Sequence, residues 1–267
     1  MNTNDGAQAA HDRRLTLQGA PNFRDFGGYP AAGGGIVRRG ALFRSGALGL
    51  LTQPDVGMLN SLGAWTIVDL RHEAERIAAP TPAQLVSSAV HSLPMGSGNG
   101  AAPVPRPALL TVPGATAGQA VEAIKASYRR FVHDHRNRFT SLFGVLLDGA
   151  PGPAVIHCTA GKDRTGISVA LVLLALGVDR DAVVGDYCAT RNYLDLSWRE
   201  QILAAMVGDP GEVNRGVADV MFDAHPDYIG ASLDEMDQHH GSPEAYLRDV
   251  IGLDAGRIET LRRRYLA

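Results

Sequence analysis

Cysteine, lysine and long hydrophobic runs are all scarce in this chain of 267 residues. Two cysteines cannot build a disulfide framework, and their scarcity fits a reducing compartment. The longest apolar run, residues 167–178, falls well short of the roughly 20 residues that cross a bilayer. The polar N-terminus has no apolar signal core. We therefore expect a cytoplasmic protein without integral membrane association, with an unconventional export route left open.

The balance of charge also excludes a class of function. Lysine and arginine total 25 against 28 aspartate and glutamate residues, so the net charge of −3 gives no electrostatic reason to expect nucleic acid as the partner. The chain is long enough to bury a full hydrophobic core. We expect residues 1–12 to be a disordered tail and residues 13–267 to form one domain.

Glycine and proline are plentiful, with 31 and 15 residues, and they divide the chain into short elements. Short strands are expected around the glycine-rich segment 27–35, and buried strands at the apolar runs 65–70 and 153–157. A long loop is expected over 94–116, and the pattern is helical from residue 181 onward. Helical spacing of apolar residues predicts four further helices, between 52 and 63, around 121–131, around 139–146 and over 165–176.

This order of elements predicts an α/β fold. We expect three layers, in which a short, mostly parallel central sheet is flanked by helices, with a helical extension toward the C-terminus. The loop between the strand at 153–157 and the helix at 165–176 then lies at the carboxyl end of a strand.

That loop carries the chemistry, and residues 157–166 read His-Cys-Thr-Ala-Gly-Lys-Asp-Arg-Thr-Gly. A cysteine between a buried strand and the first turn of a helix sits among inward-facing backbone N–H groups and a positive helix end. These features stabilise a thiolate at Cys158 and equally bind a phosphate dianion. Arg164 lies six residues on, so it can bring its planar guanidinium onto two phosphate oxygens.

Chance does not explain this spacing. With the chain's own residue frequencies, about 0.0007 matches to His-Cys-x-x-Gly-x-x-Arg are expected. Three other interpretations stay open at this point. Cys158 could be a buried, inert residue, the loop could serve a non-catalytic module that binds phosphoproteins, or the chain could be a thiol redox or sulfur-transfer enzyme.

The segment resembles the signature loop of the cysteine-dependent protein tyrosine phosphatases, in which five residues separate a cysteine from an arginine. The Gly-Lys-Asp-Arg-Thr sequence is most similar to bacterial tyrosine and phosphoinositide phosphatases of the mycobacterial protein tyrosine phosphatase B type. The resemblance covers roughly residues 15–195. Its other landmarks lie at 21–28, 42–45, 68–71 with Glu73 and Glu75, and 177–180 ahead of Asp186 and Tyr187.

The resemblance implies a phosphomonoester hydrolase that acts through a cysteinyl-phosphate. Cys158 attacks phosphorus, while Arg164 and the backbone N–H groups of the loop hold the equatorial oxygens. The Thr165 hydroxyl is expected to donate to the thiolate, and His157 to brace the loop by hydrogen bonds rather than to transfer a proton. The remaining expected substrate-binding residues are Thr159, Ala160, Gly161 and Lys162.

The leaving oxygen needs a proton donor, and the sequence contains no Trp-Pro-Asp tripeptide. Asp163 is the first candidate, as the resemblance to the Gly-Lys-Asp-Arg subgroup implies. Asp69, at the end of a predicted strand, is the second, and Asp25 is a distant third. For the second and third candidates a structural ion pair is favoured over a catalytic role, with Arg71 for Asp69 and with Arg24 for Asp25.

Lys162 is one of two lysines in a chain with 23 arginines, which points to selection for lysine at this position. At the rim of the pocket a compact ammonium meets a second phosphate, as in phosphoinositide phosphatases with the same Cys-x-Ala-Gly-Lys sequence. We therefore expect phosphotyrosine proteins, phosphoinositides or both as partners, inorganic phosphate as product, and no cofactor. The resemblance also suggests a helical lid within about residues 196–240.

The remaining cysteine and four histidines are interpreted as structural. Cys188 on a predicted helix is expected to be a small core residue, with a regulatory disulfide to Cys158 as the alternative. The histidines have no companion ligands at metal spacings, so we expect surface side chains and no metal site. They are His133, His135, His239 and His240.

Overall fold

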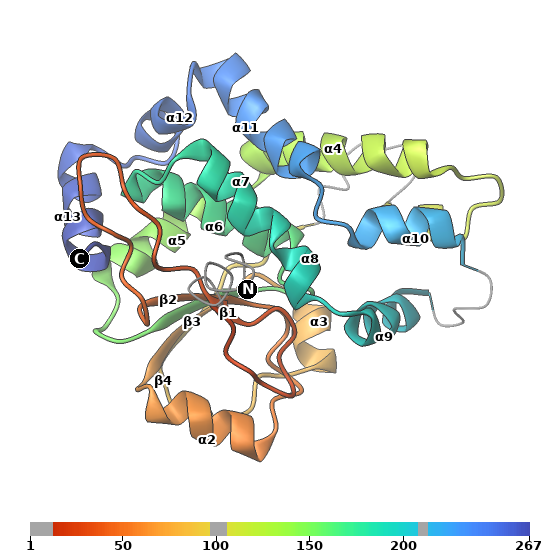
Figure 1. Cartoon of the computed structure of the whole chain (residues 1–267), viewed down its shortest axis with the longest axis horizontal. Coiled ribbons are helices and arrows are strands. Elements are labelled where there is room, and N and C mark those ends of the chain that lie inside the picture. Colours follow the sequence, from red (N-terminus) through yellow and green to blue (C-terminus); the bar gives the residue numbers. More distant parts are fainter. Residues whose placement is uncertain (1–12, 97–105, 208–212) are drawn as a thin grey trace, which may run out of the picture.

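A computed structural model describes residues 13–96, 106–207 and 213–267 (Figure 1). The predicted tail at 1–12 lies outside the described residues, as does the middle of the loop predicted over 94–116. The described part contains a five-stranded sheet in the order β1-β2-β5-β3-β4. Only β1 and β2 are antiparallel neighbours, so the mostly parallel sheet is confirmed. The strands are β1 (Arg24–Asp25), β2 (Leu42–Ser45), β3 (Trp65–Asp69), β4 (Ser87–Ser92) and β5 (Ala154–His157).

Helices cover both faces of this sheet, as the three-layer prediction requires. Figure 1 shows α2 below the sheet and the larger group of helices, α4 to α7 and α11 to α13, above it. The helices are α2 (Gln53–Ser61), α3 (Glu73–Ala78), α4 (Ala117–Asp134), α5 (Arg136–Asp148), α6 (Asp163–Leu176), α7 (Arg180–Cys188), α8 (Thr190–Tyr193), α9 (Leu196–Val207), α10 (Arg215–Phe222), α11 (Pro226–His240), α12 (Pro243–Asp249) and α13 (Ala255–Tyr265). None of the described helices is both long and apolar enough to cross a membrane.

Alternation along the strands explains why both faces are covered. Phe43, Ile67 and Val155 belong to a cluster with Leu59 of α2. Their neighbours along the strands, such as Val68 and Ile156, belong instead to the larger cluster that includes α6. Strands buried on both faces read as continuous apolar runs, which is why β3 and β5 could be predicted.

The helix α6 lies at the centre of the larger cluster, since every residue over 165–176 is buried. It ends at Gly177, whose φ of 91° is the left-handed conformation that favours glycine. It begins at Asp163, two residues before the predicted start. The loop after β5 therefore connects directly to a fixed helix.

The sequence missed three elements. The helix α3 buries none of its residues, so it leaves no apolar pattern to detect. The strand β4 lies at the edge of the sheet and is rich in serine. The prediction of a loop over 94–116 was wrong in part, because a 3₁₀ helix, η1 (Arg106–Leu110), lies within this segment.

Candidate active site

Cys158 lies where the carboxyl ends of three parallel strands meet. The last residue of β5, His157, pairs with Ser45 of β2 on one side and with Asp69 of β3 on the other. Cys158 follows directly, and its side chain lines a cavity of about 440 Å³ together with Arg164. The residues 158–164, here called the signature loop, are thus the floor of this cavity.

The carbonyl groups of the signature loop are held on its outer side. The backbone N–H of Ala47 donates to the Thr159 carbonyl at 2.9 Å. The side-chain amide of Asn22 donates to the carbonyls of Ala160 at 3.2 Å and Gly161 at 2.8 Å. In a trans peptide the following N–H points the opposite way, so the N–H groups of residues 160–162 are turned away from these donors. Successive N–H groups turned to one side are the arrangement that anion-binding concavities use in other proteins.

Gly161 is required at its place in the loop. Its φ is +66°, and a Cβ atom there would lie 2.5 Å from the backbone carbonyl carbon of Ser45. Strand β2 therefore approaches the loop so closely that only glycine fits. The close approach also brings Arg44 of β2 to the Gly161 carbonyl, to which it donates at 2.9 Å.

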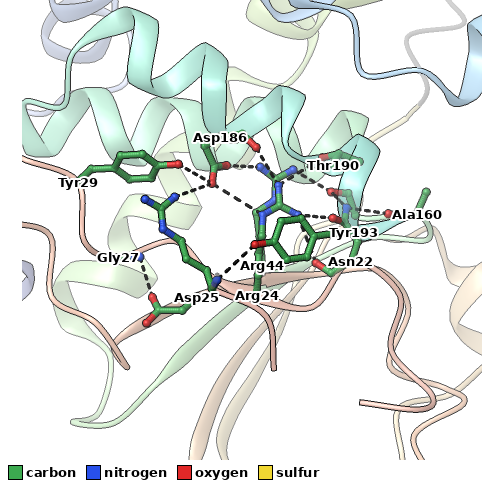
Figure 2. A network of polar contacts seen from close by, with 12 residues as sticks. Asn22, Arg24, Asp25, Gly27, Tyr29, Arg44, Ala160, Asp186, Thr190 and Tyr193 are labelled. Atoms are coloured by element: carbon green, nitrogen blue, oxygen red, sulfur yellow. Dashed lines mark hydrogen bonds and ion pairs between the residues drawn. The ribbon is translucent and has the colours of Figure 1, made fainter. Parts of the chain in front are cut away.

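A buried charge network supports these outer contacts (Figure 2). Asp186 of α7 accepts a hydrogen bond from Arg44 at 2.5 Å and lies 3.8 Å from Arg24 Nε. Arg24 donates in turn to the side-chain carbonyl of Asn22. Burial raises the pKa of Asp186, but the charges of Arg44 and Arg24 outweigh it and hold that pKa below the ordinary value. The Asp186 carboxylate is thus ionised. It holds Arg44, which donates to the loop, and Arg24, which donates to Asn22.

Arg164 is held by Glu75 of α3. The two guanidinium nitrogens of Arg164 each donate to one carboxylate oxygen of Glu75 at 2.7 Å, and the Thr159 hydroxyl also donates to Glu75. Burial opposes ionisation of Glu75, but the hydrogen bonds and charge of Arg164 lower the pKa of Glu75 to about 2. This bidentate pair orients the planar guanidinium beside Cys158.

Asp163 reaches the same cavity from the first turn of α6. The hydroxyl of Tyr128, on α4, donates to Asp163 Oδ1 at 2.7 Å and lies 2.7 Å from the hydroxyl of Tyr187. Burial raises the pKa of Tyr128 well above 10, so this phenol stays protonated and remains a donor. Asp163 is therefore a positioned carboxylate at the cavity.

Lys162 does not sit at the rim, and this corrects the sequence prediction. Its side chain is 3% exposed, and its ammonium donates to the backbone carbonyls of Met221 and, at 3.0 Å, Asp223. The ammonium also lies 3.4 Å from Asp163 Oδ1. Carbonyls at the end of α10 draw the charge inward, so Lys162 joins the signature loop to that helix.

The outer wall of the cavity is apolar. Its residues come from α4, α9 and α10, which are far apart in the sequence. They are Phe131, Ile202, Met206, Met221 and Phe222.

A model of the tyrosine phosphatase family matches residues 15–267. The chain belongs to the tyrosine phosphatase family. A Cupriavidus necator protein, provisionally named as a tyrosine-protein phosphatase, is 32% identical over 262 residues, which cover 97% of this chain and 90% of that protein. The triple specificity protein phosphatase PtpB of Mycobacterium tuberculosis is 29% identical over 272 residues, which cover 92% and 96% of the two chains. Both the resemblance and the prediction of a phosphatase are confirmed.

A more distant likeness is to TpbA of P. aeruginosa, solved in complex with phosphotyrosine. The identity is 20% and the TM-score 0.30, over 68% of this chain and 85% of that one. Such a score is too low to bear on the site.

The two other candidate acids of this tyrosine phosphatase have structural partners. Asp69 forms the predicted ion pair with Arg71, with Nη2 at 2.8 Å from Oδ2. Burial raises the pKa of Asp69, but the hydrogen bond from Arg71 outweighs it and lowers that pKa. The predicted pair of Asp25 with Arg24 is wrong, because Asp25 accepts from two backbone N–H groups, those of Gly27 and Gly40, both at 2.7 Å.

His157 and Thr165 are both fully buried beside Cys158. Among the described residues, neither ring nitrogen of His157 has a hydrogen-bond partner within 3.5 Å. Its role as a brace of the loop stays a prediction. His157 Nε2 lies 3.6 Å from Asp69 Oδ2, and burial lowers the pKa of His157 to about 4, so the ring is neutral at neutral pH. Thr165 Oγ1 likewise has no partner among the described residues, and its donation to the thiolate stays a prediction.

Sequence reasoning missed the roles of four residues that hold the phosphatase loop. Three of them lie in the landmark segments and the fourth in the helix predicted around 121–131, but no contact with the loop was predicted for any of them. The signal that identifies the missed residues is their contact with the loop, which exists only in the folded chain. They are Asn22, Arg44, Glu75 and Tyr128.

Two further expectations for this phosphatase concern residues outside the loop. Cys188 is half-buried against the core on α7, and both cysteines are free, so the structure contains the expected core residue and no disulfide between them. His135 is buried, with Nε2 2.9 Å from the Gly96 carbonyl, so its prediction as a surface residue was wrong.

Proposed function

We propose that this phosphatase hydrolyses aryl phosphomonoesters, phosphotyrosine above all, through a cysteinyl-phosphate on Cys158. The observation that carries the proposal is the loop geometry: three successive carbonyls bound on the outer side, with Arg164 clamped by Glu75 beside the cysteine. A trigonal-bipyramidal phosphoryl group would accept hydrogen bonds from the loop N–H groups and from Arg164 on its equatorial oxygens.

The chemistry takes two steps. The Cys158 sulfur attacks phosphorus and the bond to the leaving oxygen breaks, while Asp163 gives its proton to that oxygen. Water then attacks the phosphocysteine, Asp163 takes the proton of the water, and the sulfur leaves as a thiolate that the Thr165 hydroxyl stabilises. Asp163 fits this role because it lies at the cavity and is oriented by Tyr128. Asp69 and His157 support the floor.

Aryl phosphates are the favoured substrates because one wall of the cavity is apolar. Phe131, Ile202 and Phe222 offer a surface on which a phenyl ring would pack. We further propose activity on phosphoinositides, since the similar PtpB is named a triple specificity phosphatase. The Lys162 ammonium would contribute to it only by leaving its carbonyl partners on α10.

We also propose that residues 13–267 work as one catalytic domain in the cytoplasm, with α9 and α10 as the lid suggested over about 196–240. The support is that residues of both helices line the same cavity as Cys158.

Phosphate release tests the proposal. The full chain should hydrolyse p-nitrophenyl phosphate and phosphotyrosine peptides, vanadate should inhibit it, and Cys158→Ser should abolish turnover. Acid quenching with a ³²P-labelled substrate should trap label on the parent enzyme and none on Cys158→Ser. Binding of phosphopeptides without turnover would favour the non-catalytic module. Vanadate-insensitive thiol chemistry at Cys158 would favour the redox or sulfur-transfer enzyme.

A further inference from the structure

Three side chains that the phosphatase site does not use converge on the far end of α4. His133 Nε2 lies 2.8 Å from Glu235 Oε1, and His239 Nε2 lies 3.1 Å from the same oxygen. The three donor atoms all lie within 4.8 Å of one another. The sequence offered no companion ligand for these histidines, because packing of α4 against α11 is what brings Glu235 between them.

The electrostatic setting at this place favours a cation. His133 is in the last turn of α4 and His239 in the last turn of α11. The carbonyl ends of two helices, each with a negative partial charge, therefore meet where the imidazoles converge. Glu235 adds a full negative charge and is 13% exposed.

The distances also fit a small metal ion. Ligand atoms about 2.0–2.2 Å from a tetrahedral Zn²⁺ are separated by about 3.3 Å. Glu235 Oε1 is already within about half an ångström of that separation from each histidine nitrogen. The imidazoles can close on the ion by side-chain rotation, because His133 and His239 are 40% and 56% exposed. Water has access to a fourth position.

We propose that His133, Glu235 and His239 bind one first-row divalent cation, Zn²⁺ best of all. Two imidazole nitrogens with one carboxylate are a ligand set of zinc and of the neighbouring transition metals, whereas Ca²⁺ and Mg²⁺ prefer oxygen ligands. Each histidine binds through Nε2, so its ring proton moves to Nδ1.

This site is separate from the catalytic cavity, which none of the three ligands lines. It is nevertheless connected to the cavity through the helices. Tyr128, which holds Asp163, precedes His133 by five residues, about 7.5 Å along α4. The hydroxyl of Ser232 on α11 donates to the Tyr128 carbonyl at 2.7 Å. A bound cation would join α4 to α11 behind the tyrosine that orients the proposed acid.

The test uses the full chain with Cys158→Ser, which removes the catalytic thiolate as a competing zinc ligand. Isothermal titration with ZnCl₂ should give one ion per chain. His239→Ala and Glu235→Gln should each weaken binding at least about tenfold, as loss of a ligand or its support does. His240→Gln is the matched control, because His240 is the next residue of the same turn and should leave the affinity unchanged. Co²⁺ should give d–d absorption that these two ligand variants lose.

Thermal unfolding in EDTA separates lost ligation from lost folding. In EDTA, the melting temperatures of the ligand variants should be close to that of their Cys158→Ser parent. Added ZnCl₂ should raise the melting temperature of the parent but not those of the variants. Stoichiometric binding that survives in the triple variant His133→Ala, Glu235→Gln, His239→Ala would overturn the proposal, as would the absence of saturable binding in the parent. Because the test is made without the catalytic cysteine, its result does not depend on the proposed phosphatase mechanism.

Discussion

The signature loop and the helices α9 and α10 line one cavity, but they are held in place differently. Each outward carbonyl of residues 159–161 has a donor from another part of the chain, and the side-chain donors are mostly buried. In α9, by contrast, only Leu203 is buried among the residues of the helix, and Leu196 is 74% exposed. The ion pair between Arg215 of α10 and Glu200 of α9 is also exposed, which makes it a weak restraint.

This difference follows from the roles proposed for the signature loop and for the helices of the wall. Stabilising charge on a phosphoryl group needs donors fixed before the substrate arrives, so the floor is tied to buried ion pairs. In the proposed reaction the wall has to cover an apolar ring. The helix α9, with one buried residue, opens at a lower free-energy cost than α10, which buries four of its eight residues. Lys162 belongs to the loop but donates to α10, so it is a direct link between the two regions.

Removing the proposed acid should give the largest effect. Asp163→Asn keeps the shape of the side chain but cannot donate or accept the transferred proton, so kcat on an aryl phosphate should fall by about 10²–10⁴-fold. The acidic limb of the pH profile of kcat should flatten at the same time. Steady-state kinetics on p-nitrophenyl phosphate provide the measurement, with Asp181→Asn, an exposed aspartate of α7, as the control. Near-parental turnover would remove Asp163 from this role.

Breaking the support behind the floor should cost stability. Asp186→Asn leaves the buried charges of Arg44 and Arg24 without their carboxylate, and loss of one partner from such a group costs about 3–5 kcal/mol of unfolding free energy. Urea unfolding measures this loss. Asp181→Asn on the same helix is exposed and should change the free energy by less than about 0.5 kcal/mol. Equal stability of the two variants would contradict a supporting role for the network.

Removing the Lys162 ammonium, which links the signature loop to α10, should have a smaller effect. Lys162→Met keeps the buried stem but removes the ammonium that binds the carbonyls of Met221 in α10 and of Asp223 directly after it. Charged hydrogen bonds contribute about 1.5–3 kcal/mol each at most. We expect a lower melting temperature and a higher KM for phosphotyrosine peptides. Lys125→Met, at the chain's other lysine, is the matched control. Equal losses on phosphotyrosine and phosphoinositide would remove the argument that Lys162 selects lipids.

A further effect should be a change in the pH dependence of stability. The pKa of Glu75 is about 2 in the folded chain and 4.5 in its ordinary state, so its contribution is present above pH 4.5 and is lost as the pH falls toward 2. The difference in unfolding free energy between the parent and Glu75→Gln should therefore shrink over this window. Urea titrations of both proteins at several pH values between these limits give the measurement. A difference that stays constant would mean that Arg164 does not favour the ionised carboxyl.

The signature loop could be located in the sequence because its residues are contiguous. Cys158, Asp163 and Arg164 lie on one turn and one loop, so spacing alone brings them together. Glu75 and Asn22 contact the same loop from 89 and 139 residues away along the chain. No local pattern encodes such contacts, because they depend on which strand lies beside β5.

The distinction between local patterns and long-range contacts also explains the errors in the predicted fold. The strands β3 and β5 are buried on both faces and gave clear apolar runs, whereas β4 pairs with one neighbour only and contains three serines. The position of Lys162 in the loop was predictable, but the direction of its side chain was not. That direction depends on the carbonyls of Met221 and Asp223, about 60 residues later in the sequence.

The dependence of the loop on Asp186 has a consequence for the protein during its synthesis. A polypeptide leaves the ribosome from its N-terminus, so the cysteine and arginine of the loop emerge while α7, with Asp186 and Tyr187, is still to be added. Until then Arg44 has no buried carboxylate and Tyr128 lacks its hydroxyl partner. A nascent chain at that stage therefore carries the whole signature loop but lacks the carboxylate and the hydroxyl that support its residues in the folded protein.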